Sequence, residues 1–482
     1  MASRIVSPSS LARLSKTSRF VCEALYSLRN LSSFHRQLFT VHYNRKLSTL
    51  PAQRSEVLRN PIFSYEQSKS KRPRELDFAH SLVQRGQFKE ALGEIIINDT
   101  SASPIQRIWA HLLRGISSEG LSDTSHALQA YEMACEAAGE HFQVDPWLYI
   151  ECFRRYCQIL HTMGSYDTLL EGKRKLVGLL RVLNHKDPAQ YQIPLAEELA
   201  GVAITHALYG DASEGLRAAK EAEEILNRIG LSSSIPSRPL LWLKVIDTRS
   251  ILHWALDEYE WATRCSEKSV EIYRGIVENS RRDGTVDPQI EERYAIALGR
   301  FADQLRQMQN RTFKVLPLYR DALDIWISLL KTSSHTRRYA ENLQIVAQGY
   351  SATELDKEKA YGVLKAALYA IPDFFQDVQI TLLLEMSGVS AEKPGAGESE
   401  ARRALYVLDE WKGESDLLPL KLRLAAATAL SNSLRRLDKN EEAVTSMKAT
   451  EEKVDASLKV NLTLADESLL QELVEFMVSS SR

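Results

Sequence analysis

The sequence contains little glycine, proline or cysteine for its length. It has 21 glycines and 15 prolines among 482 residues, about 7% against a usual share of about 12%. This shortage disfavours folds built from strands and tight turns, and helix is the default. Five cysteines, at positions 22, 135, 152, 157 and 265, are too few and too irregularly spaced for a disulfide framework. They indicate a reducing compartment.

The chain also lacks the strings of common catalytic sites. It contains no Gly-x-Gly-x-x-Gly, phosphate loop, His-Glu-x-x-His or Gly-x-Ser-x-Gly. Cys157 and His161 are four residues apart, but Cys152 lies about 140° around a helix from Cys157. We therefore expect no enzyme, no cofactor, no metal site and no small-molecule substrate. No apolar run is long enough for a secretory signal or a membrane span.

The first fifty residues differ in composition from the rest of the chain. They hold eight Arg and Lys, ten Ser and a single acidic residue, Glu23, so they carry +7 and leave −9 on the remainder. Apolar residues fall on one helical stripe, at Leu11, Leu14, Val21, Leu25 and Leu28. An Arg-rich, Ser-rich, acid-poor amphipathic helix is typical of an organellar transit peptide. We interpret residues 1–50 as a mitochondrial transit peptide that directs the protein to the matrix.

The end of this leader contains a candidate cleavage site. Arg45-Lys46-Leu47-Ser48 resembles the site of the matrix protease, which predicts cleavage after Leu47. Two alternatives remain open. Met1-Ala2-Ser3 and the abundant Ser would suit a chloroplast address, and a basic arm that binds RNA or anionic lipid has a similar composition. Residues 51–74 form a polar linker without an apolar period, which predicts disorder.

The body of the chain repeats one pattern of small, large and turn residues. Ala79 and Leu82 precede Gly86 and Phe88, and Ala91 follows. Met163-Gly164-Ser165-Tyr166 repeats the glycine–aromatic turn, and Ala127, Tyr131 and Ala134 repeat the second half of the unit. This spacing resembles the tetratricopeptide superfamily, in which small residues allow two helices of a hairpin to approach closely.

The resemblance implies an all-α, right-handed superhelical solenoid of stacked helical hairpins. We expect about eight to nine hairpins over residues 75–463, followed by a C-terminal capping helix and tail at 464–482. The equivalent positions on the second helices are 91, 127, 169, 215, 262, 315, 360, 401 and 443, in steps of 36 to 53 residues. Below, these nine positions are called the anchors.

In such arrays the face of each first helix that lies away from the core lines a concave groove. The register places polar residues there, and they are the candidate binding residues: Glu151, Arg154, Arg155, Gln158, Arg293, Arg300, Gln304, Asn432 and Arg435. Family members that grip a C-terminal carboxylate resemble one another in a Lys and an Asn on the first helix. Leu76 and His80 stand at these positions here, which argues against that mode of binding.

Together these features predict a non-catalytic protein-interaction scaffold or assembly factor inside mitochondria. Its partners would be other proteins, held as a peptide segment or a helix in the groove. The alternative is an organellar helical-repeat protein that binds RNA. The −9 charge of the body opposes this alternative because it repels phosphate, and the drifting unit length opposes a reading of one base per repeat.

We predict that the protein loses its leader on import. N-terminal sequencing of the protein purified from organelles should find a mature start near Ser48. A mature chain that begins within residues 1–5 would contradict a cleaved transit peptide.

Overall fold

The computed structural model describes residues 72–95, 102–140, 142, 145–229, 237–284, 287–308, 312–332, 337–390, 397–410 and 417–461. The predicted leader and the predicted capping helix lie outside these residues, as does most of the linker.

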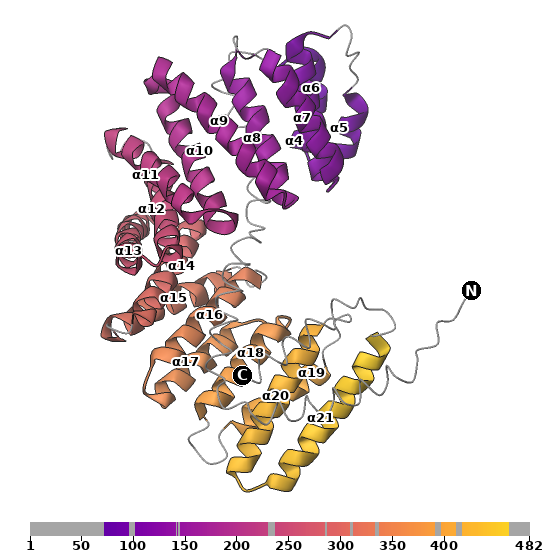
Figure 1. The fold of residues 1–482 in the computed structure, drawn as a ribbon. Helices are drawn as coiled ribbons and strands as arrows, with labels where there is room; N and C mark the ends of the chain where they lie inside the picture. Colours follow the sequence, from indigo (N-terminus) through magenta and orange to yellow (C-terminus); the bar gives the residue numbers. More distant parts are fainter. Residues whose placement is uncertain are drawn as a thin grey trace, which may run out of the picture. The chain divides into compact units, whose positions relative to one another are not determined.

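The described residues form helices and no strand (Figure 1). None of these helices is long and apolar enough to cross a membrane. A short 3₁₀ helix, η2 (Arg74–Leu76), precedes the helices α4 (Asp77–Gln84), α5 (Phe88–Glu94), α6 (Pro104–Gly120), α7 (Thr124–Glu140), α8 (Pro146–Thr162), α9 (Tyr166–Lys186), α10 (Pro188–Tyr209), α11 (Ala212–Ile229), α12 (Ser237–Ala255), α13 (Tyr259–Arg282), α14 (Pro288–Gln307), α15 (Thr312–Thr332), α16 (Arg337–Thr353), α17 (Lys357–Ala370), α18 (Gln376–Val389), α19 (Glu398–Asp409), α20 (Leu417–Arg436) and α21 (Asn440–Asn461).

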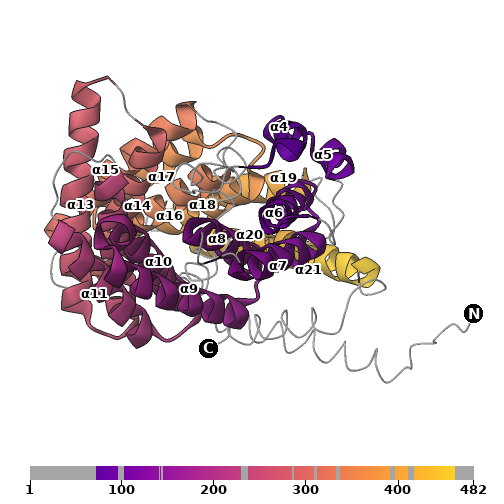
Figure 2. The ribbon, with the colours of Figure 1, turned by 90° about the horizontal axis from the view of Figure 1, so that it is seen from above.

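Consecutive helices pair into nine hairpins within the described part of the chain. In each, the first member is called helix A and the second helix B. Most helices that follow one another along the chain pack together, as Figures 1 and 2 show for α6 with α7 and for α20 with α21. The other main contacts join helices two apart, such as α10 with α12 and α18 with α20. The predicted all-α array of stacked hairpins is therefore confirmed.

The array divides into two compact units. The described part of the N-terminal unit is residues 72–265, and that of the C-terminal unit is residues 266–461. The division falls within α13, so this helix contributes its first turns to the N-terminal unit. Each unit is described by itself below.

Every anchor is buried at the same place in its hairpin. All nine are the fourth residue of a helix B. Eight have no exposed surface, and Gly215 is buried as well. Six of the nine are alanine, because a side chain of one carbon lets helix B approach helix A closely. The spacing read from the sequence therefore gave the correct register in all nine hairpins.

The turn from helix A to helix B also repeats. Five residues before an anchor, the backbone is left-handed at Gly86, Ser122, Gly164, Asp257 and Asp438. In each case the next N–H donates to the carbonyl five residues earlier, as from Gln87 to Leu82. This is the Schellman ending, which satisfies carbonyls left without partners at the end of a helix. Glycine and aspartate are among the residues that tolerate this conformation best.

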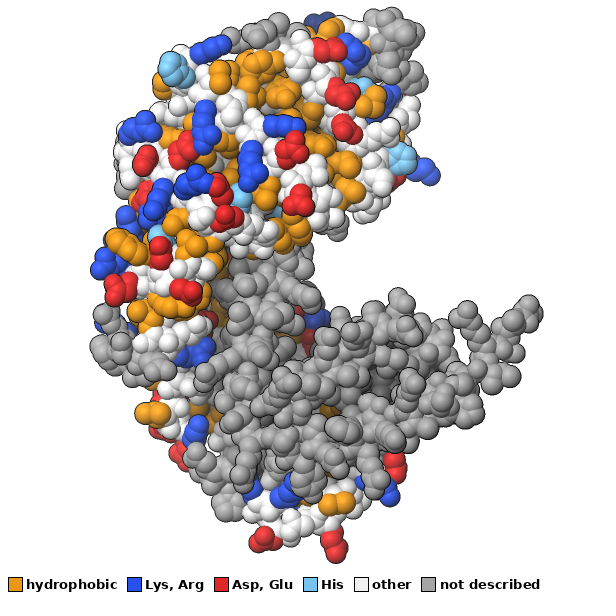
Figure 3. All heavy atoms as spheres, in the orientation of Figure 1, with side chains coloured by type: hydrophobic (Ala, Val, Ile, Leu, Met, Phe, Trp, Pro, Cys, Tyr) orange, Lys and Arg blue, Asp and Glu red, His pale blue; other side chains and the backbone are white. Residues whose placement is uncertain are grey.

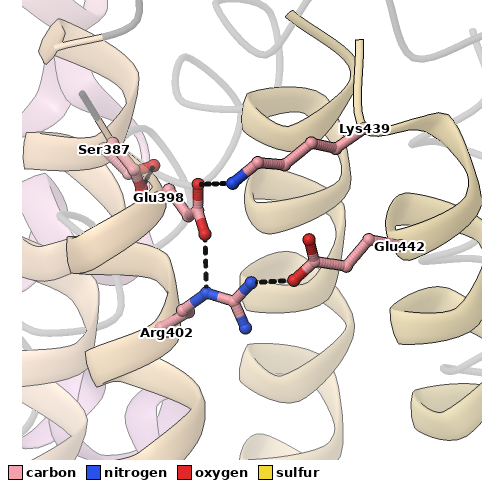
Figure 4. A network of polar contacts seen from close by, with 6 residues as sticks. Ser387, Glu398, Arg402, Lys439 and Glu442 are labelled. Carbon is pink, nitrogen blue, oxygen red and sulfur yellow. Dashed lines mark hydrogen bonds and ion pairs between the residues drawn. The ribbon is translucent and has the colours of Figure 1, made fainter. Parts of the chain in front are cut away.

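Ion pairs join neighbouring hairpins on the side of helices B. The residue after one anchor binds the residue before the next: Tyr361 donates to Glu400 over 2.7 Å, and Arg402 binds Glu442. Figure 4 shows Glu398 between Arg402 and Lys439, at 2.9 and 3.4 Å. The hydrogen bond from Arg402 lowers the pKa of Glu398. Because the Arg402–Glu442 pair is exposed, it contributes about 0–1 kcal/mol.

One glycine of this region is required by the backbone. Gly397 is the N-cap residue of α19, with φ at 95°. A Cβ atom there would lie 2.7 Å from the carbonyl oxygen of Ser387. The Ser387 hydroxyl donates to the Gly397 carbonyl over 2.8 Å, which ties α18 to the start of α19.

We predict opposite effects for two Gly→Ala substitutions in helices of the N-terminal unit. A Cβ at Gly115 would lie 2.5 Å from a ring carbon of Tyr131, which has no exposed surface and no room to move. Gly115→Ala should therefore destabilise the protein by about 1–2 kcal/mol, since overpacking outweighs the gain in helix propensity. Gly178→Ala, with nothing within 4 Å, should stabilise by about 0.5–1 kcal/mol.

Urea unfolding followed by circular dichroism measures both changes. Equal stabilisation by the two substitutions would contradict the packing of Gly115 against Tyr131.

Candidate functional site

The candidate residue Arg154, on α8, binds two carboxylates of a neighbouring helix. Its Nε atom lies 2.7 Å from Oε1 of Glu198, and its Nη2 atom lies 3.1 Å from Oε2 of Glu197. Both carboxylates belong to α10, the helix A of the next hairpin. Arg154 therefore joins two successive helices A.

Charges of alternating sign surround this contact. Burial alone would raise the pKa of Glu198, but Arg154, Lys173 and Lys244 outweigh burial and lower it. Burial alone would lower the pKa of Arg154, and Glu198 and Glu197 reverse this and raise it. Both groups therefore stay charged at neutral pH. A Cβ at Gly201 would lie 2.8 Å from Nζ of Lys173, so this glycine leaves room for the ammonium group.

The next candidates on α8 are more deeply buried. Glu151 and Arg155 are each 7% exposed and form an ion pair at 3.3 Å, one helical turn apart. Gln158 is half-buried. Charged residues are rarely buried unless they are paired, and the pairing of Glu151 with Arg155 meets this condition.

The candidates of the C-terminal unit differ in how deeply they are buried. Arg300 and Gln304, on α14, are 8% and 5% exposed. Arg293 is exposed on the same helix, Asn432 is half-buried on α20, and Arg435 is exposed near its end.

The register relates several of these residues across the two units. Arg154 and Arg300 both lie fifteen positions before an anchor, and Gln158, Gln304 and Asn432 lie eleven before. The structure brings Glu151 and Arg155 together in one ion pair and places the rest on separate turns or separate helices. Contact of these nine residues with a partner stays a prediction.

The carboxylates that hold Arg154 were not predicted from the sequence. Glu197 and Glu198 were not among the candidates, nor were Lys173 and Lys244. A usable signal exists, because opposite charges about one repeat apart come together: Arg154 and Glu198 are 44 residues apart, and Arg402 and Glu442 are 40. Pairs at the local repeat length are therefore worth searching for in such arrays.

The positions that would grip a C-terminal carboxylate are closed. Leu76 and His80 are 3% and 6% exposed. Burial lowers the pKa of His80 to about 4, and nearby Arg72 contributes to this lowering, so the imidazole is neutral at physiological pH. Neither side chain is placed or charged to bind an anion.

The described residues contain no group of three or more His, Cys, Asp or Glu side chains arranged to hold a metal ion. Burial raises the pKa of the Cys157 thiol to about 12, so it is protonated at neutral pH. A protonated thiol is a poor nucleophile and a poor metal ligand.

Comparison with known proteins gives only a structural likeness. No family model matches the chain, and no curated protein matches its sequence. RapI in its apo form is 13% identical, covers 80% of this chain and 97% of its own, and has a TM-score of 0.47. The apo quorum sensor NprR from B. thuringiensis is 12% identical, with coverages of 92% and 99% and a TM-score of 0.43. A tetratricopeptide repeat protein from Parabacteroides merdae is 12% identical, with coverages of 69% and 98% and a TM-score of 0.31.

All three TM-scores lie below 0.5, so the fold assignment rests on this chain itself. Its evidence is the buried anchor in nine hairpins and the repeated turn between helices A and B. The fold is tetratricopeptide-like.

We predict that acid destabilises the protein through His80. The pKa of this residue is about 4 in the folded protein, against the value of 6.5 that is usual for histidine. Between these values the unfolded chain binds more protons, so the contribution of His80 to stability is complete above pH 6.5 and is lost as the pH falls toward 4. His80→Leu should therefore lose less stability than the wild type between pH 7 and pH 5.

Thermal unfolding at a series of pH values measures this difference. His185, which is exposed, provides the matched control as His185→Leu. An equal slope for His80→Leu and the wild type would show that folding does not lower the pKa of His80.

Proposed function

We propose that the protein is a non-catalytic interaction scaffold that binds a segment of a partner protein along its helices A. The observation that carries this proposal is the burial of charged and amide side chains on helices A in both units. Each unit holds such groups: Glu151, Arg155 and Glu198 in one, and Glu292, Arg300 and Gln304 in the other, all less than 10% exposed.

Packing of helix A against helix B within a hairpin does not need these groups, although Glu198 and Glu292 also bind residues of a neighbouring helix A. The core that joins helix A to helix B consists of small and apolar side chains, such as the anchors. Burying a charge costs free energy that a neutral side chain of similar size would not cost. Charged groups held in place by neighbouring helices, as Arg154 is by Glu197 and Glu198, offer preorganised contacts for a bound segment.

One of the compared structures is NprR in complex with its cognate peptide NprX. That binding is a property of NprR, and the proposal for this chain depends on its own side chains.

We also propose that the scaffold works inside mitochondria, in the matrix. The basic, Ser-rich and acid-poor composition of residues 1–50 supports this location. A chloroplast is the alternative location.

Binding of RNA is the less favoured function. Figure 3 shows Lys and Arg side chains interspersed with Asp and Glu side chains on the face of the N-terminal unit that it presents. A nucleic-acid site normally gathers basic side chains into a field of one sign. The mixed surface fits a protein partner better than a phosphate backbone.

Charge reversal at Arg293 and Arg435 tests the proposal. Both are exposed, on α14 and α20. Arg154 and Arg155 are less suitable because they are buried or half-buried and bind Glu198 and Glu151. We predict that Arg293→Glu with Arg435→Glu reduces recovery of cross-linked partner proteins about tenfold or more, as expected for lost charge-assisted contacts.

Arg403→Glu provides the matched control because Arg403 is exposed on α19, a helix B. It should recover partners like the wild type, and circular dichroism should be unchanged in all variants. Parallel capture of protein and RNA from organelles decides between the two functions. Abundant transcripts without protein partners would contradict the scaffold.

A further inference from the structure

The turn between α12 and α13 exposes large aromatic side chains. Tyr259 is 41% exposed and Trp261 is 53% exposed, while Trp254 is half-buried beside them. Four other tryptophans are buried in the core, in contrast to Trp261: Trp109, Trp147, Trp242 and Trp326. We call residues 253–264 the aromatic turn; all of them belong to the N-terminal unit.

Packing of the hairpins does not explain Trp261. It stands immediately before the anchor Ala262. The same position in the other eight hairpins is always polar or charged: Glu90, His126, Thr168, Glu214, Lys314, Lys359, Glu400 and Glu442. The hairpin geometry turns this position outward, so a large apolar ring there gains little from folding. Together with the exposed ring of Tyr259, it forms an aromatic surface that is available for a contact outside the fold.

The aromatic turn is held in a defined arrangement. The Trp254 and Tyr259 rings lie 4.7 Å apart at 58°. Buried His253 binds Oε2 of Glu258 through Nδ1 over 2.5 Å, and its ring lies 6.3 Å from that of Trp261. The Tyr259 hydroxyl donates to Oδ1 of Asp257 over 2.5 Å. These contacts hold the end of α12 against the start of α13.

The charge around these rings favours a cation. Three exposed carboxylates lie in the same turn, at Asp257, Glu258 and Glu260, with Glu258 bound to His253. Arg249 and Lys220 also lie near His253. The single basic side chain within the turn, Arg264, places its guanidinium 5.0 Å from the centre of the Trp261 ring. The ring therefore already binds one guanidinium within the chain. Aromatic faces attract Arg and Lys through their quadrupole, and nearby carboxylates add to this attraction.

We propose that the aromatic turn binds a basic segment of a partner protein. An Arg or Lys side chain of the partner lies against Trp261 and Tyr259, and Asp257 and Glu260 bind its charge. Tryptophan, tyrosine and arginine are the residues that most often dominate the binding energy of protein interfaces. This surface is separate from the helix A residues of the proposed function and goes beyond it.

The experiment titrates the full chain with a fluorescein-labelled peptide of alternating arginine and glycine, followed by fluorescence anisotropy. Lysine–glycine and glutamate–glycine peptides are run in parallel. We expect both basic peptides to bind and the acidic peptide not to bind. Trp261→Ala should weaken binding of the arginine peptide about tenfold, and Trp261→Phe should weaken it less because an aromatic face remains.

A second pair of variants separates this site from general attraction to an acidic protein. Asp257→Asn with Glu260→Gln removes two charges from the aromatic turn and keeps groups of similar shape. Glu90→Gln with Glu132→Gln removes two exposed charges elsewhere in the same unit. We expect the first pair to weaken binding about tenfold and the second pair to leave it within about twofold, with unchanged circular dichroism in both.

Several results would overturn the proposal. Equal weakening by the two double variants would mean that the peptide binds by net charge alone. Preferred binding of the glutamate peptide would assign the surface to an acidic partner that contacts Arg264. Unchanged affinity in Trp261→Ala would exclude the ring from the contact.

Discussion

The close approach of helix B to helix A at the anchor is the constraint on which the rest of the array depends. A hairpin of two helices exposes an apolar face on both sides and is not stable alone, so it needs a neighbour at a fixed distance. An alanine without exposed surface at positions such as 91, 127 and 443 sets the distance within the hairpin. Packing of neighbouring hairpins then sets the distance between them, with a small contribution from ion pairs between successive helices B such as Arg402 with Glu442.

The fold was predictable because the anchor and turn are determined locally. Ala91 and Gly86 are five residues apart in one chain segment, and their sizes alone dictate how two helices meet. The buried charges were not predictable in the same way. Arg154 meets Glu198 only because of the rotation between successive hairpins, and this rotation depends on helix lengths that vary along the chain. The exposure of Trp261 was predictable only by comparing the nine hairpins, because the position before the anchor is polar or charged in the other eight.

The two candidate surfaces use different physical devices. On helices A, charged groups are buried and fixed by partners of opposite sign, so a bound segment would meet groups that are already oriented. At the aromatic turn, the exposed ring of Trp261 occupies a position that is polar or charged in the other hairpins, and carboxylates lie in the same turn. Preorganised charges favour specificity, whereas an exposed Trp contributes mainly affinity.

The connection from helix A to helix B is only three residues long after α4, α6, α8, α12, α16 and α20. Closing such a short loop costs little chain entropy, and the main contacts join helices that are neighbours or next neighbours along the chain. Folding therefore needs no search for distant contacts, and hairpins form as small cooperative steps. As a consequence, the opening of a terminal hairpin exposes only the face of the next one, and the hairpins further along remain folded.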